Sequence, residues 1–417
     1  MRLDSHGFSP AILGKILRAA ARSSSFDAAA ESLADLAEVS IGGRHVGRIA
    51  AEVGEQLQDA RDQRVDDHQK RRSTPQREVA PRLGVVSVDG GRLQVRSEEP
   101  NSGPGAHAPR WREDKVADLV TMKTQSHEHD PHPELPECFQ QKRQVVELVQ
   151  GISGQGALAD VIAATAEEPA PLALLKAPPE AEPPPPRWQP EPLVRTCEAT
   201  LRSSEAFGPM VAAEAARRNF FAAQSRAFVG DGGAWIWTLQ RTYFPTFEPI
   251  VDFVHVLSYI YLAAKAMGGP ADAVWERYLD WARACWQGRV AEVLKTLREH
   301  WETMTPPPEG QEVKSTDPYE VIRLTIGYLT HNEGRMDYPR YRRAGLPNCS
   351  GLVESLIKQF NRRVKGTEKF WNPAQAEAIL QLRAAQLSED DRLATHLKTR
   401  PISPYRRYQT TRARKAG

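Results

Sequence analysis

The chain has 417 residues and carries 55 Lys and Arg against 53 Asp and Glu, for a net charge of +2. This length is too great for one simple domain and suits two or three. Its four cysteines include no C-x-x-C pair, which argues against a zinc ribbon or a disulfide-stapled secreted scaffold. No apolar stretch approaches the roughly 20 residues of a membrane helix. We therefore expect a cytoplasmic protein without membrane contact.

The first part of the chain, residues 9–65, shows only helical periodicity. One amphipathic run has Ser24 or Ser25 as its N-cap. A Gly-Gly turn follows, and a second run opens with Arg44 and Arg48. This outline fits a helix-turn-helix that contacts DNA through these two arginines. It also fits an ordinary helical hairpin.

Composition divides the chain further. A polar segment at 61–82 indicates a link after the first helices. Ten prolines between 169 and 192 exclude helix and central strand there. We expect a helical DNA-binding region at 1–79, a larger domain at 80–395 with a proline-rich loop at 167–192 and a helical insertion at about 254–344, and a basic tail at 396–417.

Strand patterns are few. Gly84–Asp89 and Arg92–Arg96 flank Gly90-Gly91, which predicts a two-residue hairpin. A third strand is possible at Leu119–Met122. Two more short apolar runs are Ala227–Asp231 and Pro249–Phe253. Strands followed by a long helical block predict an α/β domain with a helical insertion.

Three acids stand where chemistry could use them. Asp89 and Asp231 each end an apolar strand next to glycines, and Glu354 lies on an amphipathic helix beside its buried stripe. Two Mg²⁺ ions held by a few carboxylates can activate a nucleophile and stabilise a leaving oxygen in phosphoryl transfer. Each acid taken alone also fits a simple turn, and Asp252 is a rival for the second position.

A resemblance connects these acids. Five blocks occur in order: Val88–Gly91, Phe228–Trp237, Tyr243–Pro245, Ile250–His255 and Gly345–Ser355. Together they resemble the blocks of a bacterial insertion-sequence DDE transposase with a ribonuclease H-like catalytic domain, over about residues 24–393. The resemblance implies a ribonuclease H-like mixed sheet with flanking helices, interrupted by the helical insertion before the glutamate helix.

The resemblance also implies roles. Asp89, Asp231 and Glu354 would be catalytic and would bind Mg²⁺ or Mn²⁺, as two ions, while Asp252 and His255 would support them. The partners would be double-stranded DNA, both element ends and target, and further copies of the chain in a homodimer or larger assembly, because two ends must be brought together. The protein would then associate with the nucleoid.

Basic residues surround the glutamate helix. Lys358, Arg362, Arg363 and Lys365 are expected to contact the DNA backbone, although a solvated helix face has the same composition. The stretch at 127–132 holds three histidines, but its spacing fits no helix or strand face and predicts only a polar loop.

Two other functions fit the same residues. A ribonuclease H-like nuclease would cut DNA without strand transfer. An inactive or domesticated copy would only bind DNA.

Overall fold

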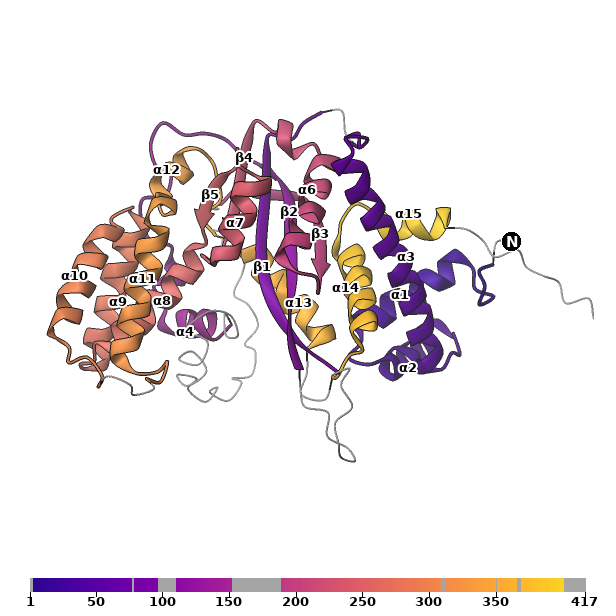
Figure 1. Cartoon of the computed structure of the whole chain (residues 1–417), viewed down its shortest axis with the longest axis horizontal. Helices are drawn as coiled ribbons and strands as arrows, with labels where there is room; N and C mark the ends of the chain where they lie inside the picture. Colours follow the sequence, from indigo (N-terminus) through magenta and orange to yellow (C-terminus); the bar gives the residue numbers. More distant parts are fainter. Residues whose placement is uncertain are drawn as a thin grey trace, which may run out of the picture.

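The computed structural model describes residues 3–76, 79–96, 110–151, 189–308, 313–349, 351–365 and 369–400. A five-stranded sheet lies at the centre of this part of the chain, between groups of helices at the two ends of the molecule (Figure 1). The expected α/β class is confirmed. Most of the proline-rich loop and the tail beyond residue 400 lie outside the described residues. No helix within those residues is long and apolar enough to cross a membrane.

The sheet is mixed, with the strand order β3-β2-β1-β4-β5. β1 pairs antiparallel with β2 and parallel with β4, β2 pairs antiparallel with β3, and β4 pairs parallel with β5. The strands are β1 (Leu83–Val95), β2 (Arg110–Lys123), β3 (Glu191–Thr200), β4 (Ser225–Gly230) and β5 (Glu248–Val251).

The hairpin predicted at Gly90-Gly91 is wrong. β1 runs through both glycines without a turn, because β2 pairs with the whole strand and places Asp114 directly across from Gly91. A Cβ at Gly91 would lie 2.6 Å from a carboxylate oxygen of Asp114, so glycine makes room for that side chain. Asp89 consequently lies within a strand and not at its end.

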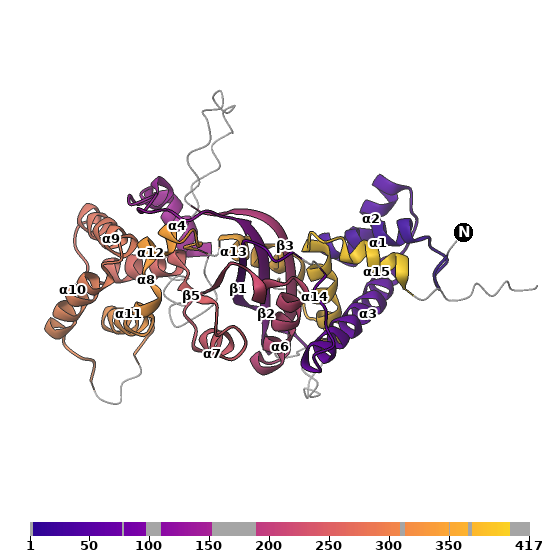
Figure 2. The same ribbon diagram turned by 90° about the horizontal axis from the view of Figure 1, so that it is seen from above.

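Helices cover both faces of the sheet. α6 (Ser204–Arg217) and α7 (Ala234–Tyr243) lie on one face, and α13 (Gly351–Val364) lies on the other (Figure 2). α14 (Pro373–Leu387) packs beside β3 and against the N-terminal helices.

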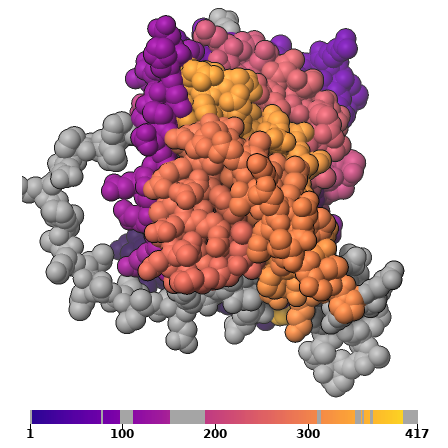
Figure 3. Space-filling view, turned by 90° about the vertical axis from the view of Figure 1, so that its left-hand side faces the viewer, coloured from indigo at the N-terminus to yellow at the C-terminus, as the bar shows by residue number. Residues whose placement is uncertain are grey.

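The described chain between β5 and α13 forms helices and their connections, at one end of the molecule. Figure 3 looks onto the surface that this helical block presents. The first helix of this block, α8, begins directly after Asp252, and the Asp252 carboxylate caps it. α4 packs against α8. The helices of this block are α8 (Phe253–Ala266), α9 (Ala271–Trp286), α10 (Val290–Thr303), α11 (Pro318–Asn332) and α12 (Tyr338–Arg343), with a short 3-10 turn at Glu333–Arg335. α4 (Lys142–Gly151) comes earlier in the chain, before β3, and two more 3-10 turns lie at Glu137–Phe139 and Phe220–Ala222.

The N-terminal helices are α1 (Pro10–Arg22), α2 (Phe26–Ala37) and α3 (Gly43–Gln69). Ser25 caps α2, as one of the two expected residues. The segment taken for a link at 61–82 begins inside α3, because residues 61–69 are the last turns of that helix and Arg61 is buried there; the connection to β1 starts after Gln69.

The N-terminal helices share one hydrophobic cluster with α13, α14 and the ends of β1, β2 and β3. The predicted tail also begins within structure, because α15 (Arg392–Thr399) buries Leu393 and Leu397 against this cluster. The boundary expected at 79/80 falls in the connection between α3 and β1, whereas the tail boundary at 395/396 falls inside α15.

Candidate active site

Three aspartates lie at the same level on three neighbouring parallel strands, one within β1 and the other two directly after β4 and β5. Val88, Gly230 and Val251 are paired side by side across β1, β4 and β5. The next residue on each strand is an aspartate: Asp89, Asp231 and Asp252. Because adjacent strands are about 4.8 Å apart, the register itself gathers the three carboxylates at one place on the sheet.

Asp89 lies on β1, at one side of this group, next to Asp231 on the middle strand, and is half-buried. Burial and repulsion from Asp231 and Asp252 outweigh the opposing effects of His255 and the Gly90 N–H, and together they raise the pKa of Asp89 to about 8. The Gly90 N–H donates to Asp89 Oδ1 at 2.6 Å. The charges of Asp231, Asp252 and His255 thus all act on the Asp89 carboxyl group.

Asp231 is held by a tight turn after β4. Its Oδ1 accepts a hydrogen bond from the Gly233 N–H at 2.7 Å, across Gly232 with a φ of +100°. The Tyr328 hydroxyl donates to the Asp231 carbonyl oxygen at 2.8 Å. Tyr328 in turn stacks on Tyr259, with ring centroids 3.7 Å apart. The helical block thus supports the backbone that carries this carboxylate.

Asp252 and His255 form a buried pair beside the other two aspartates. Asp252 Oδ1 accepts from the Val254 N–H at 2.9 Å, and its Oδ2 lies 3.3 Å from Nδ1 of His255. Burial lowers the pKa of His255, but the bond to Asp252 and the charges of Asp252, Asp231 and Asp89 outweigh it and raise that pKa to about 10. His255 is therefore a cation at neutral pH, and both oxygens of Asp252 are engaged in fixing it and the start of α8.

This division of contacts favours Asp231 over Asp252 as the second ligand. Asp252 is 1% exposed, and both of its carboxylate oxygens contact groups of the protein. Asp231 is half-buried, and its Oδ1 accepts a hydrogen bond from the Gly233 N–H. The two residues that the sequence left as rivals lie side by side, with different local roles.

Glu354 lies in the first turn of α13. Its side chain lies outside the described residues, so its distance to the aspartates is not part of the structure. Two residues later, Leu356 is buried in the same cluster as Val116, and Val116 pairs directly with Asp89. Directly paired residues face the same side of a sheet, so α13 packs on the face toward which Asp89 points.

Oxygen donors of this kind fit hard divalent cations such as Mg²⁺ and Mn²⁺. Mutual repulsion among Asp89, Asp231 and Asp252 is the expected property of carboxylates grouped around a cation. Among the residues whose side chains are described, no three His, Cys, Asp or Glu form a ready metal-binding group. The pair Asp89 and Asp231 would need a third ligand such as Glu354.

The expected DNA-binding residues are exposed in four cases, buried in the case of Arg363, and without a described side chain in the case of Lys358. Arg44, Arg48, Arg362 and Lys365 are exposed, the first two near the start of α3. The side chain of Lys358 lies outside the described residues.

Arg363 corrects the expectation for the α13 cations. Its side chain is buried, with Nε donating to the Ala20 carbonyl at 2.7 Å and Nη1 donating to the Ser24 carbonyl at 3.3 Å. We therefore assign Arg363 a structural role at the end of α1. It follows Arg362 in sequence but points to the other side of the helix.

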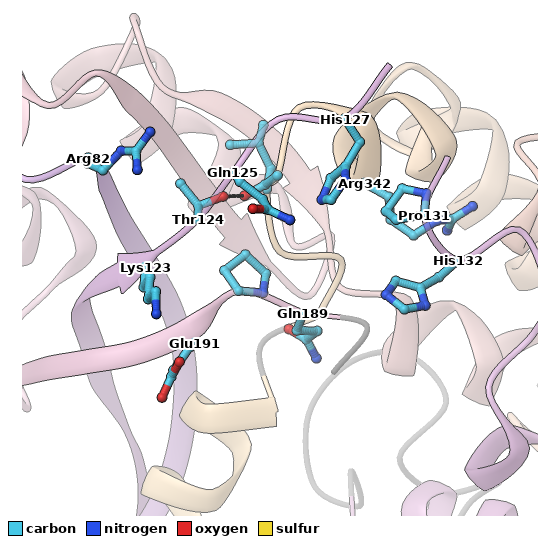
Figure 4. A pocket seen from close by; sticks show the side chains of 13 residues that line it. Arg82, Lys123, Thr124, Gln125, His127, Pro131, His132, Gln189, Glu191 and Arg342 are labelled. Carbon is cyan, nitrogen blue, oxygen red and sulfur yellow. Dashed lines mark hydrogen bonds between the residues drawn. The ribbon is translucent and has the colours of Figure 1, made fainter. Parts of the chain in front are cut away.

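A cavity of about 380 Å³ lies away from the aspartates. It is bounded by the end of β2, the start of β3, the histidine-containing loop and the turn after α12 (Figure 4). His127 and His132 line it, while Asp130 of the same loop binds the buried Arg342. The stretch at 127–132 is thus a polar loop in the described structure, as expected.

No protein-family model matches the chain, and no curated protein matches it. The functional conclusion rests on the residues described above.

Sequence reasoning missed two buried acids on the face of Asp89. Asp114 and Asp118 are fully buried on β2 and alternate with Val116. Asp114, Val116 and Asp118 are two positions apart, which is the spacing of residues on one face of a strand. The mostly polar residues at Arg110–Lys115 made this strand hard to recognise in the sequence. β3 was likewise not predicted from the sequence, because this strand directly follows the proline-rich stretch.

Proposed function

We propose that the protein is a DDE transposase, which cleaves DNA at the ends of a mobile element and joins those ends to target DNA. The observation that carries the proposal is the register of β1, β4 and β5, which brings Asp89 and Asp231 together beside the Asp252–His255 pair. The mixed sheet with helices on both faces, interrupted by a helical block before α13, is the arrangement expected of a ribonuclease H-like domain.

Asp89, Asp231 and Glu354 would hold two Mg²⁺ or Mn²⁺ ions. When bound, such ions activate an attacking oxygen and stabilise the leaving oxygen of a phosphodiester. The protonated His255, fixed by Asp252, offsets part of the negative charge of the aspartates. The turn at Gly232 and the Tyr328 hydrogen bond keep the Asp231 backbone in place.

The chemistry consists of two displacements at phosphorus. Water attacks the phosphodiester at the element end, the P–O3′ bond breaks, and a 3′-hydroxyl is released opposite a 5′-phosphate. That hydroxyl then attacks a phosphodiester of the target, displacing another 3′-oxygen and joining the strands. Neither step needs a covalent enzyme intermediate, so one set of acids can serve both.

The test is an assay of a plasmid carrying the element, with Mg²⁺ or Mn²⁺ and target DNA. We expect cleaved ends and joined products from the unmodified protein, and a loss of at least about 10³-fold in both for Asp89→Asn and for Asp231→Asn. Asp280→Asn is the matched control, because Asp280 is an acid on α9 whose side chain is 77% exposed. Unchanged activity in the first two variants would remove the catalytic assignment.

The same assay separates the other functions. Cleavage without joined products would identify a nuclease instead. DNA binding without metal-dependent cleavage would identify a protein that only binds DNA. Cross-linking in the presence of element ends tests the expected dimer or larger assembly.

A further inference from the structure

Five cations meet where α1, α13 and α14 come together. We call them the arginine cluster: Arg22, Arg362, Arg363, Lys369 and Arg383. They come from the end of α1, from the end of α13 and the segment after it, and from α14. Within the described residues none of the five makes an ion pair with an acid. Neighbouring cations usually alternate with acids on a protein surface, so this grouping needs a reason.

Two members are buried and fixed. Arg363 is 2% exposed and its guanidinium lies against the rings of Phe26 and Trp371, at 4.6 and 4.9 Å from their centroids. Its Nη2 is buried without a hydrogen-bond partner. Arg383 is 7% exposed and donates to the Gln359 carbonyl at 2.9 Å. Both guanidinium groups are held by neutral oxygens and rings, which leave their charges uncompensated.

The members repel one another. Burial and, after it, the charges of Arg22 and Arg362 lower the pKa of Arg383 to about 10. Burial and the charge of Arg383 lower the pKa of Arg363 in the same way, to about 10. Lys369, whose Nζ donates to the Arg363 carbonyl at 3.2 Å, also has its pKa lowered by burial and by Arg363. An anion placed against the cluster would relieve this repulsion.

The cluster has an open side. Arg22 and Arg362 are exposed, so their positive charges are accessible to solvent, whereas Arg363 and Arg383 are buried. Arg362 follows Glu354 by eight positions on α13, which is roughly 12 Å along the helix axis at 1.5 Å per residue. That separation equals about three to four base pairs of DNA at 3.4 Å each.

We propose that the arginine cluster binds backbone phosphates of duplex DNA about three to four base pairs from the phosphodiester that reacts. Arg22 and Arg362 contact the phosphates directly, and Arg363 and Arg383 supply the fixed positive charge behind them. The position relative to the reacting bond rests on the proposed function. The phosphate binding itself does not.

The experiment measures binding of a fluorescent 30-base-pair DNA duplex by anisotropy at 50–200 mM salt, with no divalent metal. The variant is Arg22→Gln/Arg362→Gln, because both side chains are exposed and make no hydrogen bond or ion pair with the described residues. Lys295→Gln/Arg298→Gln is the matched control, because it removes two exposed cations from α10, at the far end of the molecule (Figure 2). An RNA duplex of the same sequence is titrated in parallel.

We expect the first variant to reduce the slope of log K against log salt by roughly 1.8, at 0.9 per phosphate contact, and the control to leave it unchanged. Equal slopes for the two variants, no binding of the DNA duplex, or tighter binding of the RNA duplex would overturn the inference. The proposed function fails separately: a reduced slope without metal-dependent cleavage rejects the transposase, and normal cleavage with an unchanged slope rejects the arginine cluster alone.

Discussion

Asp114 is a carboxylate buried in the sheet without a hydrogen-bond partner for either oxygen. It lies across from Gly91, on the same face as Asp89. Burial raises the pKa of Asp114 to about 6, and Lys365 and Lys115 only partly oppose the rise. A buried carboxylate with no partner is more stable as the neutral acid, so this position weakens the fold above its pKa.

Replacing Asp114 should change how stability depends on pH. The folded pKa of about 6 is above the ordinary value of 3.8, so the folded chain holds a proton that the unfolded chain has lost. That contribution is complete below pH 3.8 and is lost as pH rises through 6, a difference of roughly 3 kcal/mol. We expect Asp114→Asn to raise the free energy of unfolding relative to the unmodified protein at pH 8, and to change it little at pH 4. Urea unfolding at the two pH values measures this, and an equal effect at both would contradict it.

Gly232 permits the turn that holds Asp231. Its φ of +100° disfavours any residue with a side chain, and a Cβ there would lie 2.5 Å from the Tyr328 ring. Gly232→Ala should therefore cost at least about 2 kcal/mol and lower cleavage, because Tyr328 could no longer bond the Asp231 carbonyl. Gly327→Ala is the control, since Gly327 lies in α11 with open space around it and should gain up to about 1 kcal/mol. Thermal unfolding and the cleavage assay provide the readouts, and similar behaviour of the two variants would refute the role of Gly232.

At the scale of the elements, local patterns predicted helices better than strand pairing. Ser25 caps α2 as expected, and Leu356 and Phe360 form the buried stripe of α13. Gly90-Gly91 misled because a two-residue turn and a long strand with glycines share one local pattern. Only the pairing with β2, which follows after residues 97–109, distinguishes them. That information is tertiary and is absent from the local sequence.

α3 is joined to α14 by a buried ion pair. Arg61 Nη1 lies 2.8 Å from Glu377 Oε1, and Glu377 also accepts from the Thr200 hydroxyl and the Leu201 N–H, each at 2.8 Å. The side chains of Arg61 and Glu377 are 2% and 10% exposed. This contact fixes the N-terminal helices to the rest of the molecule, and it explains why a segment that is polar in sequence is a packed helix.

Breaking this pair should be costly. Arg61→Met leaves the buried Glu377 carboxylate without its cation, for which we expect a loss of roughly 3–5 kcal/mol. Arg72→Met, which removes the same charge from a pair with Asp66 that is 54% and 38% exposed, should cost less than about 1 kcal/mol. Denaturant unfolding of the two variants measures the contrast. Comparable losses would mean that α3 is not anchored through Arg61.

At the scale of the whole molecule, the sequence indicated the ingredients of the candidate site but not its surroundings. Asp89, Asp231 and Asp252 each follow an apolar run, and that pattern was readable. Their common level depends on the register across three strands, which the sequence does not contain. The burial of Arg363 could not be predicted either, because it depends on the packing of α1 against α13, more than 300 positions away in the chain.

The gathering of three aspartates predicts that divalent cations stabilise the whole fold. Repulsion among Asp89, Asp231 and Asp252 opposes folding when no cation is present, and His255 offsets only part of it. A cation that binds the folded chain and not the unfolded one stabilises by about 2.7 kcal/mol at 100 times its dissociation constant. We therefore expect Mg²⁺ and Mn²⁺ to raise the melting temperature by several degrees at constant ionic strength.

The Asp89→Asn/Asp231→Asn variant should lose this response, because amide groups bind these cations far more weakly than carboxylates. Asp280→Asn should keep it, since Asp280 lies on the exposed face of α9. Differential scanning fluorimetry against MgCl₂, with NaCl adjusted to hold the ionic strength, separates specific binding from screening. An equal rise in the double variant would place the cation elsewhere on the chain, and the phosphoryl-transfer chemistry would then lack its metal site.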